Sequence, residues 1–183
     1  MPFGNPWKTV KSRIVYKNPW ISVREDEVIQ PNGTPGIYGV LDTRIANGVV
    51  ALTPEREVYL VGQYRYPNDV YSWEIIEGGT DEGEEPLECA KRELKEEAGL
   101  IAQTWHLLGH EIHMSNCVTS EVGYLFIAED LMETESDPDD TEILQIRKVP
   151  FTDAIAMVES GEIVDAFTII GLLLAERWLA KNG

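Results

Sequence analysis

Apolar and polar residues alternate along several short segments in the first half of the chain, and this alternation is typical of β-strands that bury one face. It predicts strands at residues 13–16, 20–29, 37–41, 49–53 and 58–64. Turn residues lie between them, for example Pro31-Asn32-Gly33 after the second strand. Further strands are predicted at residues 105–112, 123–128 and 144–149.

Helical spacing of apolar residues appears in three places. The clearest segment covers residues 86–98, with Pro86 near its first turn and Gly99 as a stop signal. Two more helices are predicted at residues 152–159 and from about residue 166 to 180, where Asp165 is a candidate N-cap. Runs of strands with helices in separate places favour an α+β domain with a mixed β-sheet.

Length and composition indicate one main folded domain. The chain has 183 residues, of which 43% are hydrophobic and 26% charged, so a core of useful size can be buried. We assign residues 1–45 to an N-terminal strand extension and residues 46–183 to the main domain. The longest apolar stretch, residues 167–175, is too short to cross a membrane, and the two cysteines lack metal or disulfide spacing. We therefore expect a cytoplasmic protein without a membrane partner.

The formal net charge of −17 bears on the choice of partner. Such a surface repels nucleic acid, so we expect no nucleic-acid partner. Acidity alone can serve solubility. A small substrate that carries phosphate could still bind where metal ions supply positive charge.

The helix at residues 86–98 places several glutamates on one face. Glu93 and Glu97 stand at i and i+4, and Glu96 lies beside them. Like charges at this spacing repel, whereas a hard divalent cation such as Mg²⁺ binds carboxylate oxygens. Arg92 lies four residues before Glu96 and can orient it. The alternative is a solvated acidic face, because charged helix faces are common.

Residues 78–100 read GGTDEGEEPLECAKRELKEEAGL, and this segment resembles the Nudix box at every defined position. The resemblance implies a Nudix fold, in which a mixed β-sheet lies between helices, and hydrolysis of a pyrophosphate bond. It also implies Mg²⁺, with Mn²⁺ as a possible substitute, held by Glu93, Glu96 and Glu97. The backbone carbonyl of Glu77 is a further implied ligand, although many relatives carry Pro-Ala-Gly where this chain has Ile76-Glu77-Gly78.

Three other stretches resemble the nucleoside diphosphate sugar hydrolases, the ADP-ribose pyrophosphatase-like subfamily. In Gln63–Pro67 the resemblance implies that Arg65 meets a substrate phosphate, and before the box it implies that Glu74 binds the terminal part of the substrate. The alternative for Arg65 is an ion pair with an acidic residue. Residues 161–168 resemble a motif that opens the last helix, and we assign them no chemistry.

In the subfamily the general base often comes from a glutamate on a loop after the box, so the resemblance implies a base there. Glu142 is the first candidate and Asp140 the second, and the alternative is that Glu96 or Glu97 transfers the proton. Glu121 matches the acidic end of a loop motif of the subfamily and is a candidate metal or substrate ligand. That loop, residues 115–121, lacks the proline and glycine of its relatives.

Aromatic residues near the N-terminus are candidates for the nucleotide base. Trp20 and Tyr16 lie in the predicted N-terminal strands and could stack on a base, although core packing is the commoner role of such residues. In the subfamily these strands often exchange between subunits, so the resemblance implies a homodimer.

The predicted reaction is metal-dependent hydrolysis of a nucleoside diphosphate sugar, such as ADP-ribose or a GDP- or ADP-hexose, to nucleoside monophosphate and sugar phosphate. Another nucleotide is the alternative substrate, for example a nucleoside triphosphate or a dinucleotide cofactor. A different class is a sensor that binds nucleotide sugar without turnover. Such sensors usually lose glutamates of the box, whereas this sequence keeps them. A structural Ca²⁺ protein is disfavoured because the acidic run at residues 129–142 lacks EF-hand spacing.

Overall fold

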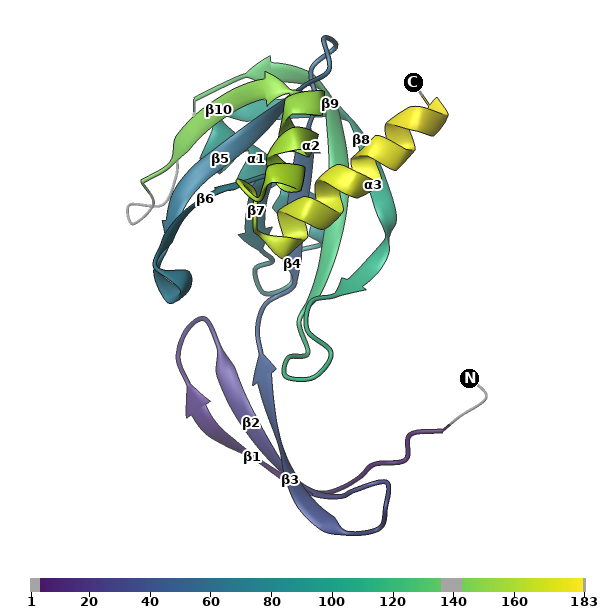
Figure 1. Ribbon diagram of the computed structural model, residues 1–183. Helices are drawn as coiled ribbons and strands as arrows, with labels where there is room; N and C mark the ends of the chain where they lie inside the picture. Colours follow the sequence, from purple (N-terminus) through teal and green to yellow (C-terminus); the bar gives the residue numbers. More distant parts are fainter. Residues whose placement is uncertain (1–3, 136–142, 183) are drawn as a thin grey trace. The chain divides into compact units, whose positions relative to one another are not determined.

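The computed structural model describes residues 4–135 and 143–182 (Figure 1). Its strands are β1 (Lys8–Lys17), β2 (Ser22–Ile29), β3 (Pro35–Asp42), β4 (Ala46–Ala51), β5 (Glu57–Arg65), β6 (Val70–Glu74), β7 (Ile76–Gly79), β8 (Leu100–His113), β9 (Val122–Glu133) and β10 (Gln145–Pro150). Its helices are the 3₁₀ helix η1 (Tyr66–Asn68) and the α-helices α1 (Pro86–Ala98), α2 (Phe151–Ser160) and α3 (Ala166–Asn182).

The chain folds into two compact units. The first extends to Arg44 and also contains residues His113–Val122, and the second contains Ile45–Ile112 and the chain from Gly123 onward. The first unit holds the antiparallel sheet β1-β2-β3, in which Lys8 pairs with Ile29 and Ser22 with Asp42. Every residue of β1 is exposed.

The second unit contains two sheets, with strand orders β10-β5-β6 and β7-β4-β9-β8. In the larger sheet β4 runs parallel to β9 and antiparallel to β7, so the sheet is mixed. Together with the separate helices, this arrangement confirms the predicted α+β class.

Alternate residues of β4 face opposite sides of the sheet, and each side packs against a helix. Val49 and Ala51 belong to the buried cluster that includes Ala90 and Leu94 of α1. On the other face, Gly48 lies so close to Phe167 of α3 that an added Cβ would stand 3.1 Å from its ring. The predicted sheet with helices on both sides is therefore present. Figure 1 shows α2 and α3 side by side.

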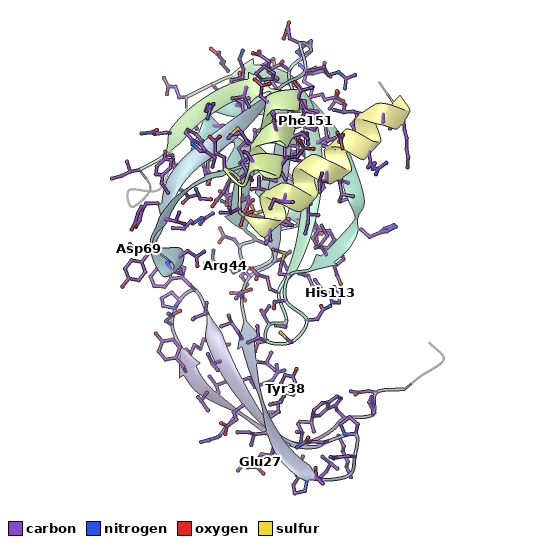
Figure 2. All side chains as sticks on the ribbon, in the orientation of Figure 1. Glu27, Tyr38, Arg44, Asp69, His113 and Phe151 are labelled. Carbon is purple, nitrogen blue, oxygen red and sulfur yellow. The ribbon has the colours of Figure 1, made fainter. Side chains whose placement is uncertain are left out.

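The helices match their predictions better than the strands do. Helix α1 has the predicted bounds, and Asp165 caps α3 by accepting a hydrogen bond of 2.7 Å from the Thr168 amide. The sequence patterns missed β6, β7 and η1, and β8 begins at Leu100 rather than at residue 105. Figure 2 shows Asp69 at the tip of the hairpin between β5 and β6, where its φ of 55° reverses the chain. Among the described residues, no helix is long and apolar enough to span a bilayer.

Candidate functional site

Helix α1 presents the glutamates of the box from a firmly seated position. Pro86 occupies its first turn, and Gly99 ends it in the left-handed conformation, with φ of 62° and its amide bonded to the Leu94 and Lys95 carbonyls. The side chains of Ala90 and Leu94 are fully buried against the sheet. The helix is thus fixed at both ends and along one face, which fixes the backbone that carries the glutamates.

Arg92 connects the loop before α1 to two of these glutamates. Its Nε and Nη2 atoms each donate a 3.0 Å hydrogen bond to the Glu84 carboxylate. Its Nη1 atom donates to Glu93 at 2.6 Å and to Glu96 at 2.8 Å. Its Nη2 atom also donates to the Gly79 carbonyl at 3.2 Å. These bonds raise the pKa of Arg92 and lower that of Glu84, so both groups stay charged. The predicted contact between Arg92 and Glu96 is present, and its role in orienting a metal ligand stays a prediction.

The backbone of β7 approaches the carboxylates of Glu93 and Glu97 at close range. A Cβ placed on Gly78 would stand 1.9 Å from Cδ and Oε1 of Glu93, so only glycine leaves that carboxylate its present place. Glu97, which is 5% exposed, accepts a 3.2 Å hydrogen bond from the Glu77 amide. Strand β7 and helix α1 therefore enclose the glutamates from two sides.

The Glu77 carbonyl points toward the same region by the geometry of the strand. Strand β7 is at the edge of its sheet, paired with β4 on one side. In an antiparallel strand the N–H and C=O of one residue point to the same side. Because the Glu77 amide bonds to Glu97, the Glu77 carbonyl faces the side on which Glu97 lies.

The chemistry of this donor set fits a hard divalent cation. Glu93, Glu96 and Glu97 offer carboxylate oxygens, and the absence of a side chain at Gly78 lets the Glu93 carboxylate lie against the backbone of β7. Such oxygens are the ligands that Mg²⁺ and Mn²⁺ prefer. Within residues 4–135 and 143–182, no three acidic, histidine or cysteine side chains already surround one point closely enough to hold an ion. Arg92 instead neutralises Glu93 and Glu96, so a metal would have to compete with its guanidinium.

Arg65 and Glu74 form a second element of the site. The Arg65 Nε atom donates to both Glu74 oxygens, at 2.9 and 3.0 Å, and its Nη2 atom donates to Oε2. The Glu74 side chain is only 2% exposed, whereas that of Arg65 is 39% exposed. Both line a pocket of about 370 Å³ that also includes Ser72, Asp165 and Ala166. Arg65 thus forms the ion pair that was its alternative role, and its expected contact with phosphate stays a prediction.

Glu77 directs its side chain away from α1 and toward α3. Its Oε1 atom accepts a 2.8 Å hydrogen bond from the Thr168 hydroxyl, and the same hydroxyl oxygen accepts a 3.1 Å bond from the Ile75 amide. Burial raises the pKa of the Glu77 carboxyl well above its usual value, and the negative charges of Asp165 and Glu74 raise it further. Sequence reasoning gave Thr168 no role. Only its place in the motif at residues 161–168 pointed to it.

Three candidate residues lie in the first compact unit, apart from the unit that holds the box. Glu121 has a raised pKa because it is partly desolvated, although a hydrogen bond with Thr43 opposes this effect. Trp20 is 70% exposed and Tyr16 is 54% exposed. Core packing, the commoner role for such aromatics, is therefore wrong for these two side chains within the chain.

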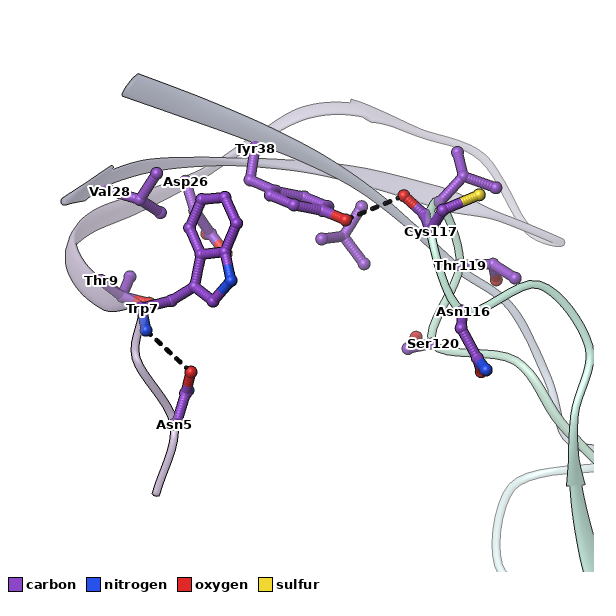
Figure 3. A pocket seen from close by; sticks show the side chains of 12 residues that line it. Asn5, Trp7, Thr9, Asp26, Val28, Tyr38, Asn116, Cys117, Thr119 and Ser120 are labelled. Atoms are coloured by element: carbon purple, nitrogen blue, oxygen red, sulfur yellow. Dashed lines mark hydrogen bonds between the residues drawn. The ribbon is translucent and has the colours of Figure 1, made fainter. Parts of the chain in front are cut away.

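The same unit contains a pocket of about 330 Å³ whose lining includes Trp7 and Tyr38 (Figure 3). These two rings meet edge to face, with centroids 5.4 Å apart. The Tyr38 hydroxyl donates a 3.0 Å hydrogen bond to the Cys117 carbonyl, which connects the sheet to residues 113–122. The pocket thus combines an aromatic wall with backbone and polar groups.

The candidate bases Glu142 and Asp140 lie outside the described residues.

Comparison with known proteins decides the family. Residues 42–167 match the NUDIX domain, and residues 7–41 match the nucleoside diphosphate sugar hydrolase N-terminal domain. The chain belongs to the Nudix family.

Two relatives cover nearly all of this Nudix hydrolase. An ADP-ribose pyrophosphatase of Bacillus subtilis is 31% identical over 163 residues, 88% of each chain. A GDP-mannose pyrophosphatase of Yersinia enterocolitica is 30% identical and covers 92% of this chain and 94% of its own.

A crystal structure described as an ADP compounds hydrolase shares the fold, with a TM-score of 0.87. It is 24% identical and covers 97% of this chain and 96% of its own. The likeness confirms the predicted Nudix fold. Nudix hydrolases generally depend on a divalent metal, in keeping with the carboxylate oxygens on α1.

Proposed function

We propose that this Nudix hydrolase cleaves the pyrophosphate bond of a nucleoside diphosphate sugar, releasing nucleoside monophosphate and sugar phosphate. One observation carries the proposal. The complete box, with its glutamates gathered between α1 and β7, stands in the same chain as a match to the N-terminal domain of nucleoside diphosphate sugar hydrolases. ADP-ribose and GDP- or ADP-hexoses are the candidate substrates, because the similar proteins are named for ADP-ribose and GDP-mannose.

The metal ligands proposed are the carboxylates of Glu93, Glu96 and Glu97 and the carbonyl of Glu77. These oxygens would hold Mg²⁺, or Mn²⁺ in its place, which would supply charge neutralisation at the phosphates and acidify a water. Arg92 keeps the carboxylates of Glu93 and Glu96 in place, because its Nη1 atom donates to both. Arg92 also bonds to Glu84 through its Nε and Nη2 atoms, which would keep its guanidinium in place if a cation took over part of that charge.

The pocket beside Arg65 is proposed to receive the part of the substrate beyond the scissile bond. Arg65 would contact a phosphate through the exposed part of its guanidinium, and Glu74 would bind the terminal sugar. The pair is suited to this task because Glu74 accepts hydrogen bonds from Nε and Nη2 of Arg65, and these bonds fix the plane of the guanidinium. Glu74 is joined to β7 through the single residue Ile75, which supports a place for this pocket next to the glutamates of the box.

A general base completes the reaction by taking a proton from the attacking water. Glu142 is proposed for this role, with Asp140 as the second candidate. The alternative is Glu96 or Glu97, of which Glu96 is the more accessible, with 37% of its side chain exposed. A general base contributes on the order of 10²–10⁴-fold to the rate.

The first compact unit, with the segment at residues 1–45, is proposed to provide the nucleotide-base side and the dimer contact. Trp20 and Tyr16 offer exposed rings for stacking. Strand β1 is exposed along its whole length, and an exposed strand edge can pair with a second chain. We therefore propose a homodimer with exchanged N-terminal strands, which sedimentation analysis of the full chain and of Ile14→Glu would test. A cytoplasmic location is proposed because Cys117 is an exposed free thiol, which a reducing compartment preserves.

Phosphate release from a substrate panel tests the reaction. The panel contains ADP-ribose, GDP-mannose, UDP-glucose, NADH, diadenosine polyphosphates and nucleoside triphosphates, each with a coupled phosphatase and with or without Mg²⁺. Metal-dependent turnover of the sugar nucleotides that Glu97→Gln abolishes would support the proposal. Tight binding of a sugar nucleotide without turnover of any compound would reject it in favour of a sensor.

A further inference from the structure

Thr168 connects three parts of the second compact unit through one buried side chain. It lies in the first turn of α3 and is fully buried. Its amide bonds to the Asp165 cap at 2.7 Å, which fixes the start of the helix. Its hydroxyl reaches across to the link between β6 and β7. The last helix is thus tied directly to the strand that precedes the box.

The hydroxyl of Thr168 both accepts and donates a hydrogen bond. Its oxygen accepts the Ile75 N–H at 3.1 Å, and its one proton goes to Oε1 of Glu77 at 2.8 Å. A hydroxyl has one proton to donate and lone pairs to accept, so a single side chain satisfies both neighbours. Ile75 and Glu77 point to the α3 side of the strand, while Ile76 between them packs in the cluster with α1. Thr168 therefore holds the Ile75 backbone and the Glu77 side chain, one on either side of Ile76.

The backbone fixed in this way is the one that faces the metal-binding glutamates. The Glu77 amide donates to Glu97 at 3.2 Å, and the Glu77 carbonyl points to the same side. The next residue, Gly78, lies against the Glu93 carboxylate. A displacement of residues 75–78 would move the Glu77 carbonyl, the bond to Glu97 and the Gly78 backbone that lies against Glu93 together.

We propose that Thr168 is a positioning residue for metal binding: its hydroxyl holds residues 75–77 so that the Glu77 backbone faces Glu97. The inference rests on the proposed function insofar as the box glutamates hold the catalytic metal. Thr168 itself touches neither substrate nor metal. It acts through Glu77, in the manner of a partner that orients a metal ligand, and loss of such a partner weakens metal affinity by about 10–100-fold.

The test compares Thr168→Val with Thr168→Ser. Valine keeps the branched shape and removes the hydroxyl, whereas serine keeps the hydroxyl. Binding of Mn²⁺ to each protein without nucleotide is measured by electron paramagnetic resonance. Thr168→Val should raise the dissociation constant for Mn²⁺ by about 10-fold or more, and Thr168→Ser should restore it to near the wild-type value. A thermal melt of each variant reports the folded fraction.

A matched control is Thr53→Val. The Thr53 hydroxyl accepts a 3.2 Å hydrogen bond from the Glu57 amide in the turn between β4 and β5, so the variant also loses a threonine hydroxyl that serves the backbone. Its Mn²⁺ affinity should equal that of the wild type. If Thr168→Val lowers only the melting temperature and binds Mn²⁺ as the wild type does, the proposal is overturned.

A second variant covers the case in which Thr168→Val does not fold. Glu77→Ala removes the acceptor at the other end of the same hydrogen bond, and unchanged Mn²⁺ affinity would again overturn the proposal. The binding assay needs no turnover, so it separates this inference from the proposed function. A wild type that turns over no sugar nucleotide, but whose Mn²⁺ binding is weakened by Thr168→Val, would retain the positioning role and reject the proposed reaction.

Discussion

Replacement of Gly78 by alanine should lower the catalytic rate strongly and the stability of the fold only slightly. The added Cβ would stand 1.9 Å from Cδ and Oε1 of Glu93, whereas ordinary contact begins at 3.4 Å. The carboxylate must therefore withdraw by about 1.5 Å, given that packed atoms do not overlap. Misplacement of a reacting group by about 1 Å can cost on the order of 10²-fold in rate. We expect kcat of Gly78→Ala to fall by about that factor.

The cost in stability should be small by comparison. The atoms that the new methyl meets are at the end of a flexible side chain rather than in the backbone. Glu93 can rotate away at the expense of its bond to Arg92, so the free energy of unfolding should fall by only about 1 kcal/mol, the low end for an added methyl group. Urea denaturation measures this change in stability. Turnover of a sugar nucleotide across a range of Mg²⁺ concentrations measures the change in kcat.

Gly62→Ala provides the steric control. Its Cβ would meet the Tyr71 hydroxyl at 2.3 Å and the Trp73 ring at 2.8 Å, away from the box glutamates. This variant should lose at least as much stability as Gly78→Ala. The Mg²⁺ concentration at which it reaches half of its maximal turnover should equal that of the wild type. If Gly78→Ala keeps kcat within about threefold of the wild type, the position of Glu93 does not depend on the missing Cβ and the reasoning fails.

Three further substitutions test the surroundings of the site. Arg92→Lys loses the fork that reaches Glu84 and two box glutamates, so kcat should fall by about 10–100-fold in a steady-state assay, and a rate near the wild type would exclude an orienting role. Glu84→Gln should flatten the acid dependence of stability: hydrogen bonds from Arg92 hold the pKa of Glu84 below 4.5, so its stabilisation is fully present above that pH and is lost as pH falls through the lowered folded-state pKa. Urea denaturation at several acidic pH values measures this slope, which should be steeper in the wild type. Glu142→Gln should lower kcat by about 10²–10⁴-fold with an unchanged melting temperature, and a normal rate for Glu142→Gln with a large loss in Asp140→Asn would move the general base to Asp140.

Helix α1 could be predicted to the residue because its signals are local. Proline in the first turn and glycine at a left-handed C-cap act within a few residues of chain. Strands β6 and β7 carry no such signal. The segment from Ser72 to Ile76 is a nearly continuous buried run, with Ile75 and Ile76 packed on opposite faces, so the alternation that marks a half-buried strand is absent.

The part of the site within one helix was also predictable, whereas contacts between elements were not. The spacing of Arg92 and Glu96 is fixed by the helix, and their bond was expected. The pairing of Arg65 with Glu74 depends on the register of β5 against β6, in which Val61 opposes Glu74. The bond between Thr168 and Glu77 joins residues 91 positions apart. Neither the strand register nor this tertiary contact follows from local spacing.

The single residue between β6 and β7 limits how the chain can change in length. Glu74 ends a strand of one sheet and Ile76 begins a strand of the other, so Ile75 alone carries the crossing. One inserted residue would turn every later side chain of β7 to the opposite face, which would direct Glu77 into the core and Ile76 toward Thr168. Among homologues we expect insertions and deletions to collect in turns such as the one between β4 and β5, while the distance in sequence from Glu74 to the box stays constant. That constant spacing could help to find relatives whose sequences have otherwise diverged.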